Sequence, residues 1–309
     1  ELATVRDWLR FAVSRFNAAA LVYGHGTDNA LDESAFLILT ALKLPIDALD
    51  PWLDARLTRP ERHRLAGLID ARVTTRKPAP YLVGEAFIAG RRFAIDERVI
   101  IPRSFIGELL VRDPTVLAPE SDAVRRVLDL CTGSGCLAIL AAEAFPDATI
   151  DAVDMSADAL DVARRNVADY ALNERIELVS SDLFDGLAGR RYDLILSNPP
   201  YVTSAAVAAF PPEYRAEPRL AHDGGSDGLD LVRRILADAR RHLTGNGTLL
   251  VEVGQTADAL EALYPEIGFV WLDTEQSARE VFLLPAAAVP ASDSSDRPPR
   301  RRTRRLARA

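Results

Sequence analysis

Residues 126–138 read RVLDLCTGSGCLA: a short apolar run, a turn that contains two glycines, and a second apolar stretch. The first run is short and rich in branched apolar residues, a pattern that predicts a buried β-strand. Gly133 and Gly135 permit a tight turn and a close approach of the backbone to a ligand. The helix expected after the turn presents free N–H groups at its beginning. The stretch therefore predicts a strand–loop–helix unit that binds a polar group above the loop.

The same alternation of strand-like and helix-like segments continues as far as Leu284. Seven short strands are predicted, in the segments RVLDL, TIDAVD, IELVS, YDLILS, GTLLVEV, FVWLD and REVFLL. Alternation of this kind favours an α/β fold with a largely parallel, doubly wound sheet, in which ligands bind beyond the carboxyl ends of the strands. The polar residues at those ends are therefore the candidate site.

The second predicted strand ends at Asp154, about 20 residues after the glycines, where a carboxylate can accept both hydroxyl protons of a ribose. A cofactor that contains a nucleoside is therefore implied. The series Gly133-x-Gly135-x-x-Ala138 satisfies the dinucleotide fingerprint G-x-G-x-x-G/A, which leaves NAD open as the cofactor. The fingerprint alone is weak and does not decide between nucleoside cofactors.

Two further positions favour S-adenosylmethionine. Methyltransferases that bind this cofactor use the same strand–loop–helix unit without a pyrophosphate. They add an acidic residue at the end of the first strand and a polar or acidic residue after the third strand, near the adenine edge. Asp129 and the pair Asp182-Leu183 stand at those two places. An Asp at a strand end is also an ordinary helix N-cap, so only the conjunction of both positions favours S-adenosylmethionine.

The fourth predicted strand ends in Ser197-Asn198-Pro199-Pro200-Tyr201, where neither a strand nor a helix can continue. A planar nitrogen, in an amide or a nucleobase amine, is a poor nucleophile because its lone pair is delocalised, so it needs alignment more than deprotonation. The Asn198 side-chain oxygen and the Pro199 carbonyl can accept the two N–H bonds of such a group. Tyr201 offers an aromatic face to it. The turn therefore predicts a clamp for the methyl acceptor.

The pattern divides the chain into four parts. Apolar residues recur at helical spacing in 1–85, which predicts a small N-terminal helical domain. Residues 86–101 alternate in polarity and predict a β-hairpin linker. Residues 102–286 hold the predicted S-adenosylmethionine-dependent methyltransferase domain, and 287–309 form an Arg-rich tail that we expect to be disordered.

Charge separates the tail from the rest of the chain. The formal net charge is −8, although RPPRRRTRRLARA at residues 297–309 holds seven Arg and no acid. The acidic body is a poor general surface for a polyphosphate, whereas the tail could contact RNA. A solvated tail without a specific role is the equally weighted alternative.

Composition disfavours a membrane span, a secretion signal and a metal site. No stretch approaches the roughly 20 uninterrupted apolar residues of a membrane span, and the start ELATVRDWLRFAVSRF is amphipathic rather than signal-like. The two cysteines lie in one turn without a second Cys/His pair to complete a zinc site, and they fit reduced thiols in a cytoplasm. We expect a cytoplasmic protein with no membrane contact and no metal. Its histidines are scattered and form no triad: His25, His63, His222 and His242.

The motifs DLCTGSGC, DAVDMS, SDLF and SNPPYV, together with VIIPRS upstream, resemble those of the glutamine methyltransferases of the HemK/PrmC/PrmB group. The resemblance extends from the first predicted helix to Leu284, and within the group it is closest to the PrmB type. Cys131 stands where the release-factor enzymes usually carry Gly, and Ser104 stands where they usually carry Pro. The segments FPPEYRAEP and SDGLDLVRRIL point the same way. AHDGG is a looser match, and the Arg tail departs from the family pattern.

The resemblance implies a class I, Rossmann-like methyltransferase with a mixed seven-stranded sheet, preceded by a helical domain that recognises the protein substrate. It implies transfer of a methyl group from S-adenosylmethionine to a glutamine side-chain amide in a large-subunit ribosomal protein. The implied cofactor-binding residues are Asp129, Cys131, Thr132, Gly133, Ser134, Gly135, Asp154, Met155, Asp182, Leu183 and Asn198. The implied catalytic residues are Asn198, Pro199, Pro200 and Tyr201. Pro102 and Arg103 are expected near the substrate, although an Arg after a Pro could equally form a surface ion pair.

Other interpretations remain open. The target glutamine could belong to a peptide chain release factor, as in the PrmC type. A nucleobase exocyclic amine could also fit the clamp, but an enzyme for duplex DNA would need a basic cleft. An NAD-dependent oxidoreductase would need a His/Lys/Tyr arrangement that is not visible. A non-catalytic ribosome-binding module would leave the clamp unexplained. Residues 203–228 are long for a strand-to-helix connection and predict a lid.

Overall fold

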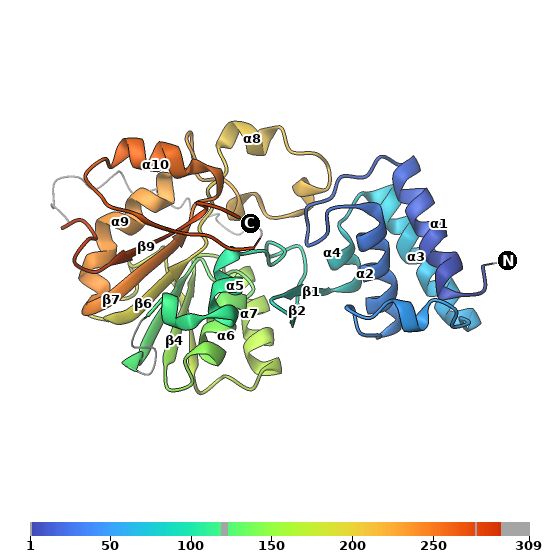
Figure 1. Cartoon of the computed structure of the whole chain (residues 1–309), viewed down its shortest axis with the longest axis horizontal. Helices are drawn as coiled ribbons and strands as arrows, with labels where there is room; N and C mark the ends of the chain where they lie inside the picture. Colours follow the sequence, from blue (N-terminus) through green and yellow to red (C-terminus); the bar gives the residue numbers. More distant parts are fainter. Residues whose placement is uncertain (1, 119–122, 276, 292–309) are drawn as a thin grey trace, which may run out of the picture.

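The structure is a computed structural model that describes residues 2–118, 123–275 and 277–291. A lobe of helices lies at one end of the molecule and a sheet covered by helices lies at the other, with a two-stranded hairpin between them (Figure 1). Residues 292–309 of the predicted tail at 287–309 lie outside the described residues, so its disorder and its contact with RNA stay predictions.

The helical lobe consists of α1 (Val5–Ala18), α2 (Ala30–Leu42), α3 (Arg59–Thr75) and α4 (Ala79–Val83), with a 3₁₀ turn η1 (Asp50–Trp52) before α3. Helices α1 and α3 begin with capping boxes, in which Thr4 or Thr58 accepts from the backbone three residues on and an acid reaches back. The apolar faces of the four helices close a core of their own. Buried members of this core include Phe16, Leu37, Ile38, Leu65 and Ile69.

The hairpin pairs β1 (Glu85–Ile88) with β2 (Arg91–Ala94) in antiparallel register. It is held against the sheet lobe by Asn166 of α7, whose amide accepts from the backbone of Ala94 at 2.8 Å and donates to it at 3.0 Å. The strands end at Ala94, and the chain then runs without a regular element from Ile95 to Ser104. The hairpin begins at Glu85, one residue before the predicted linker 86–101, which also includes part of this connecting segment.

The second lobe contains the predicted mixed seven-stranded sheet, and the predicted fold class is confirmed. Its strands lie in the order β5-β4-β3-β6-β7-β9-β8. The first five are parallel, and β9 is antiparallel to both β7 and β8. Their bounds are β3 (Arg126–Leu130), β4 (Thr149–Asp154), β5 (Ile176–Ser180), β6 (Tyr192–Ser197), β7 (Leu243–Glu252), β8 (Val270–Leu272) and β9 (Val281–Pro285).

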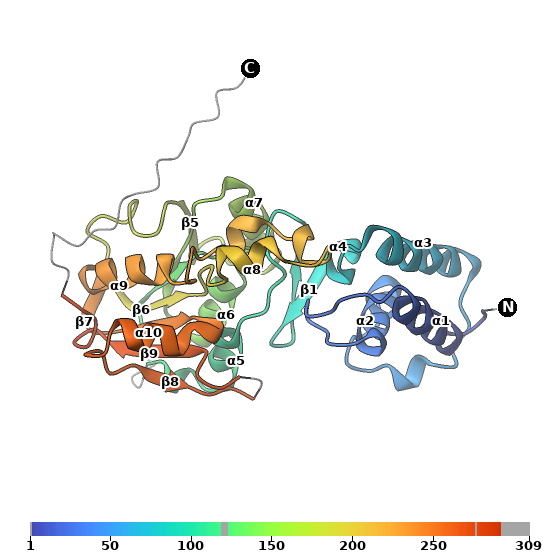
Figure 2. The same cartoon turned by 90° about the horizontal axis from the view of Figure 1, so that it is seen from above.

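Helices cover both faces of this sheet (Figures 1 and 2). On one face lie α5 (Phe105–Arg112), α6 (Cys136–Ala144) and α7 (Ala157–Asp169), and on the other α9 (Asp230–His242) and α10 (Ala257–Leu263). The short helix α8 (Ser204–Ala208) and the turns η4 (Tyr214–Ala216) and η5 (Arg219–Ala221) follow β6 and extend towards the helical lobe. Two further 3₁₀ turns, η2 (Pro114–Val116) and η6 (Gly254–Thr256), follow α5 and β7. No helix among the described residues is long and apolar enough to cross a membrane.

Strand order reverses between β3 and β6, because β4 lies on one side of β3 and β6 on the other. The connections after these two strands leave in opposite directions, which opens a crevice beyond their carboxyl ends. The glycine-containing loop follows β3, and the SNPPY turn follows β6. The sheet order therefore places the two main sequence motifs at the edge where ligands bind.

Candidate active site

A cavity of about 710 Å³ opens at the carboxyl ends of β3, β4, β5 and β6. Many of the predicted site residues line it, from four different strand ends: Cys131, Gly133, Asp154, Met155, Asp182, Leu183, Asn198, Pro199, Pro200 and Tyr201. Residues between Phe210 and Asp223, in the connection after β6, form one wall of the cavity. They include Tyr214, Leu220 and His222. One cavity thus contains both the predicted cofactor residues and the predicted acceptor clamp.

The loop after β3 depends on its two glycines in different ways. A side chain at Gly133 would meet nothing within 4 Å, so its backbone faces open space at the cavity. Gly135 has φ +80°, and a Cβ there would lie 3.2 Å from the Cβ of Ala163, so its absence lets α6 begin close against α7. Cys131 also adopts a left-handed φ of 61°, a strained conformation for a residue with a side chain.

Asp129 is fully buried below this loop. Its Oδ2 accepts hydrogen bonds from Thr132 Oγ1 at 2.6 Å and from the backbone N–H of Ala138 at 3.1 Å. Its Oδ1 is buried and has no hydrogen-bond partner in the described part of the chain. Burial raises the pKa of Asp129 to about 7. Asp129 therefore holds the loop from below through Thr132 and Ala138.

The remaining loop residues support this arrangement from behind. Thr132 and Ser134 are buried, and the backbone carbonyl of Ser134 accepts from Asn166 at 2.9 Å. Asp129, Thr132, Ser134 and Gly135 do not themselves line the cavity. Their predicted roles in cofactor binding therefore stay predictions, with the backbone of the loop as the nearer contact.

Asp154 joins the loop after β3 to the start of α7. Its Oδ2 accepts from the backbone N–H of Gly133 at 3.0 Å, and its Oδ1 accepts from that of Ser156 at 2.9 Å. Burial raises the pKa of Asp154, while these backbone hydrogen bonds oppose the change. Each carboxylate oxygen keeps a further lone pair, so the side chain can still accept from ribose hydroxyls. Met155 beside it is 46% exposed and adds an apolar surface to the cavity.

Asp182 and Leu183 follow β5, the strand next to β4, and line the same cavity. Asp182 forms an ion pair of 2.9 Å with Arg234 of α9, a cavity residue that the sequence interpretation did not identify. No local signal marks Arg234, because its partner lies 52 positions away and meets it only through the packing of α9. Leu183 has a left-handed φ of 48°, and Cys131 is also left-handed. The backbone is therefore strained at two of the predicted cofactor positions.

The SNPPY turn is attached to its surroundings at both ends. Ser197 Oγ donates to the backbone carbonyl of Leu130 at 3.0 Å, which joins β6 to the end of β3. The Tyr201 hydroxyl donates to Glu252 Oε1 at 3.1 Å, and Glu252 Oε2 accepts from Ser104 Oγ at 2.6 Å. Burial raises the pKa of Glu252 to about 7. Glu252 therefore holds the Tyr201 ring in place, a role not identified from sequence.

Three glycines allow the backbone around this turn to close. A Cβ at Gly224 would lie 2.7 Å from the Pro200 carbonyl oxygen, and one at Gly228 would lie 2.3 Å from that of Tyr201. A Cβ at Gly254 would lie 2.5 Å from the Tyr201 ring. These glycines were not predicted as site residues, although the glycines of AHDGG, SDGLD and EVGQ were visible in the sequence as a signal.

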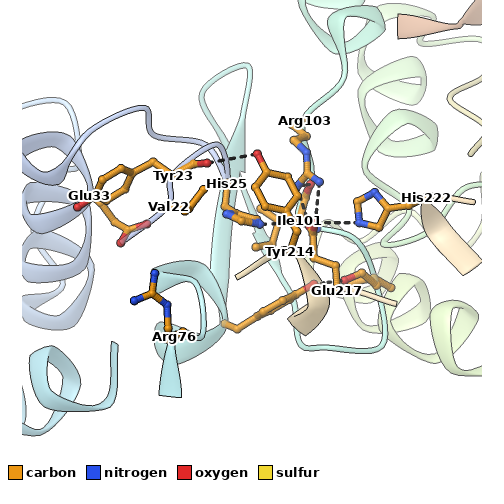
Figure 3. A network of polar contacts seen from close by, with 12 residues as sticks. Val22, Tyr23, His25, Glu33, Arg76, Ile101, Arg103, Tyr214, Glu217 and His222 are labelled. Carbon is orange, nitrogen blue, oxygen red and sulfur yellow. Dashed lines mark hydrogen bonds and ion pairs between the residues drawn. The ribbon is translucent and has the colours of Figure 1, made fainter. Parts of the chain in front are cut away.

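The two residues predicted near the substrate separate in the structure. Arg103 lines the main cavity and forms a two-pronged ion pair with Glu217, with both N–O distances at 2.6 Å (Figure 3). Pro102 is buried and lines a second, small cavity of about 90 Å³ together with His25. Among the described residues no group of His, Cys, Asp and Glu side chains is arranged to hold a metal.

Comparison with known proteins identifies relatives that align with nearly the whole chain. A family model described as "Methyltransferase small domain" matches residues 112–210. A ribosomal protein uL3 glutamine methyltransferase of Bordetella pertussis is 54% identical over 92% of this chain and 95% of its own length. Proteins of the same name from Neisseria gonorrhoeae and Burkholderia pseudomallei are 54% and 50% identical, over 92% and 93% of this chain and 95% and 96% of their own lengths.

A solved structure of the hMettl16 catalytic domain, in complex with MAT2A 3′UTR hairpin 1, is similar in fold. Its TM-score is 0.51 at 17% identity, over 84% of this chain and 95% of that chain. At that identity the similarity concerns the fold alone.

Proposed function

Because this chain belongs to the family of ribosomal protein uL3 glutamine methyltransferases, we propose that it transfers the methyl group of S-adenosylmethionine to the side-chain amide nitrogen of a glutamine in uL3. The observation that carries this proposal is the single cavity that joins Asp154 and Leu183 to Asn198 and Tyr201. The reaction would take place in the cytoplasm, where ribosomal proteins are synthesised.

The residues present fit this cofactor. Asp154 would accept the ribose hydroxyls, and Asp182 and Leu183 would border the adenine. The open backbone at Gly133 would receive the methionine part, and Asp129 would support this loop from below through Thr132 and Ala138. When bound there, S-adenosylmethionine supplies an electrophilic methyl group on a sulfonium sulfur.

The clamp residues would align the acceptor. The Asn198 side-chain oxygen and the Pro199 carbonyl would each accept one N–H of the glutamine amide, which directs the nitrogen lone pair towards the methyl group. The aligned nitrogen would take the methyl group from the sulfonium sulfur, leaving S-adenosylhomocysteine, and one amide proton would then pass to solvent. No protein base is required, because the nitrogen becomes acidic once the methyl group has arrived. Tyr201, held by Glu252, would bound the planar amide on one face.

The test uses purified protein with tritiated S-adenosylmethionine and two substrates in parallel. These are ribosomal proteins from a strain that lacks the endogenous activity, and recombinant release factor, each digested and mapped by mass spectrometry. Label on one glutamine of uL3 is the expected result. Label in the release factor would keep the chemistry and overturn the substrate. Label only in RNA would overturn the proposed class of acceptor.

A further inference from the structure

The cavity wall between Phe210 and Asp223 contains two buried glutamates, Glu213 and Glu217, both from the segment FPPEYRAEP. No step of the proposed reaction uses either of them. Each lies where the connection after β6 meets another part of the chain: Glu213 contacts Val22 and Arg76, and Glu217 contacts Ile101 and Arg103. Figure 3 shows Glu217 with its partners. A buried carboxylate is costly unless it is paired, so the partners of each glutamate indicate its role.

Glu217 accepts hydrogen bonds from three residues, Ile101, Arg103 and His222. Its Oε1 accepts from the backbone N–H of Ile101 at 2.9 Å and from Arg103 at 2.6 Å. Its Oε2 accepts from Arg103 at 2.6 Å and lies 3.0 Å from His222 Nε2. His25 Nε2 of the helical lobe lies 3.6 Å away, beyond hydrogen-bond distance. Burial acts to raise the pKa of Glu217, but the hydrogen bonds from His222 and Arg103 outweigh it and hold the pKa at about 2.

His222 connects this carboxylate to the acceptor clamp. Because an ionised carboxylate only accepts, the imidazole donates from Nε2, and this fixes the position of the His222 residue. The His222 backbone carbonyl in turn accepts from the N–H of Val202 at 2.9 Å, and Val202 follows directly after Tyr201. The Val202 carbonyl accepts from Gly224 at 2.8 Å. The position of the clamp is therefore linked to Glu217 through one side chain and one backbone hydrogen bond.

The same wall is fastened to the helical lobe. Glu213 Oε1 accepts from the backbone N–H of Val22 at 3.0 Å and pairs with Arg76 at 2.6 Å. The Tyr214 hydroxyl donates to the carbonyl of Tyr23 at 3.2 Å, and the Tyr214 ring lies 4.3 Å from that of His25. The wall thus touches the clamp on one side and the predicted substrate-recognition domain on the other.

We propose that Glu217 is a positioning residue for methyl transfer: through Arg103 and His222 it fixes the cavity wall and the turn that ends in Tyr201. The inference rests on the proposed function. A buried, fully hydrogen-bonded ion pair adds little net stability compared with an apolar pair, but it defines one geometry, which is what alignment of a weak nucleophile requires.

The test compares Glu217→Gln with Asp151→Asn. Asp151 is a matched control, because it is a buried carboxylate that pairs with Arg190 at 2.9 Å, accepts from Tyr192 at 2.6 Å, and does not line the cavity. In Glu217→Gln, kcat for uL3 should fall by about 10- to 100-fold, while the dissociation constant of S-adenosylmethionine changes less than about threefold. In Asp151→Asn, kcat should stay within about twofold of wild type. An unchanged kcat in Glu217→Gln, or equal losses of turnover and cofactor affinity, would overturn the inference.

A second pair of variants covers the case in which Glu217→Gln does not fold. His222→Gln keeps an N–H donor near the position of Nε2, whereas His222→Phe removes it, so turnover should be retained in the first and fall by about tenfold or more in the second. Equal turnover in the two would count against the inference.

Hydrogen exchange at the Val202 amide separates this inference from the proposed function, since it needs no acceptor. Its protection should fall by about tenfold in Glu217→Gln and in His222→Phe but not in Asp151→Asn. A wild-type protein that methylates no glutamine would refute the proposed function, and unchanged protection of Val202 would refute the role of Glu217.

Discussion

Asn198 and Asp154 line the same cavity from the ends of β6 and β4, which lie on either side of β3, and the proposed chemistry gives them different roles. Asp154 is already engaged with the backbone at Gly133 and Ser156, so it is part of the cofactor-binding framework. Asn198 stands at the start of the SNPPY turn, where an acceptor amide would bind. Substitutions at these two residues should therefore affect different kinetic constants.

Asn198→Ala should reduce turnover of uL3 by about 100-fold or more, because the acceptor nitrogen loses its alignment. The dissociation constant of S-adenosylmethionine should stay within about threefold of wild type. Steady-state kinetics and calorimetry measure the two quantities. Asn173→Ala, in an exposed turn, serves as the control. A collapse of cofactor binding in Asn198→Ala would show that the division of roles is wrong.

Glu252 should make the unfolding free energy depend on pH, because burial raises its pKa from 4.5 to about 7. Between these values the folded protein keeps a proton that the unfolded chain has released, so this group makes stability fall as pH rises from about 4.5 to about 7. Glu252→Gln removes that contribution, which is on the order of 3 kcal/mol at about 1.4 kcal/mol per pH unit.

The measurement is the unfolding free energy of wild type and Glu252→Gln at several pH values. The advantage of wild type over the variant should be largest near pH 4.5 and should shrink up to about pH 7. A difference that is constant with pH would mean that Glu252 does not titrate in this range.

At the scale of elements, the backbone of two other segments, at residues 224–228 and at Gly254, approaches the SNPPY turn too closely to leave room for side chains. Gly254 opens the 3₁₀ turn η6 after β7, has φ +53°, and touches the face of Tyr201. The turn after β7 and the turn after β6 therefore pack directly against each other. A larger residue at Gly254 should displace the Tyr201 ring.

Gly254→Ala should lower turnover by about tenfold and destabilise the protein by about 1–3 kcal/mol, because a Cβ would lie 2.5 Å from the Tyr201 ring and the backbone is left-handed. Gly268→Ala is the control, since a Cβ there would meet nothing within 4 Å. Enzyme assays and denaturant unfolding of both variants give the comparison. Equal behaviour of the two variants would argue against close packing at Tyr201.

At the scale of the whole molecule, the cavity lies in the sheet lobe and one of its walls also contacts the helical lobe. A cofactor that binds there should stabilise the folded chain by mass action. At about 100 times its dissociation constant, S-adenosylmethionine should add about 2.7 kcal/mol to the unfolding free energy.

Thermal unfolding measures this effect, and NAD should produce no shift. Asp154→Ala should shift the S-adenosylmethionine response to higher concentrations, because the ribose loses its acceptor. Stabilisation by NAD alone would restore the dinucleotide interpretation of the Gly133 loop. An unchanged response in Asp154→Ala would contradict the ribose assignment.

The sequence by itself determined the α/β architecture, the strand–loop–helix unit at Gly133 and the turn at Asn198. These signals are local: short runs of apolar residues, glycines that permit a tight turn, and prolines that end a strand. Because parallel strands bring their carboxyl ends to one edge of a sheet, the same signals also indicated which residues would gather around a ligand.

Only the tertiary structure decided which distant side chains complete the site. Tyr201 meets Glu252 51 positions away, and Arg103 meets Glu217 114 positions away. Such contacts depend on strand order and on how the connection after β6 packs against the helical lobe, neither of which leaves a periodic pattern in the chain. Pro102, adjacent to Arg103 in sequence, lies in a different cavity for the same reason: neighbouring side chains on an extended segment point in different directions.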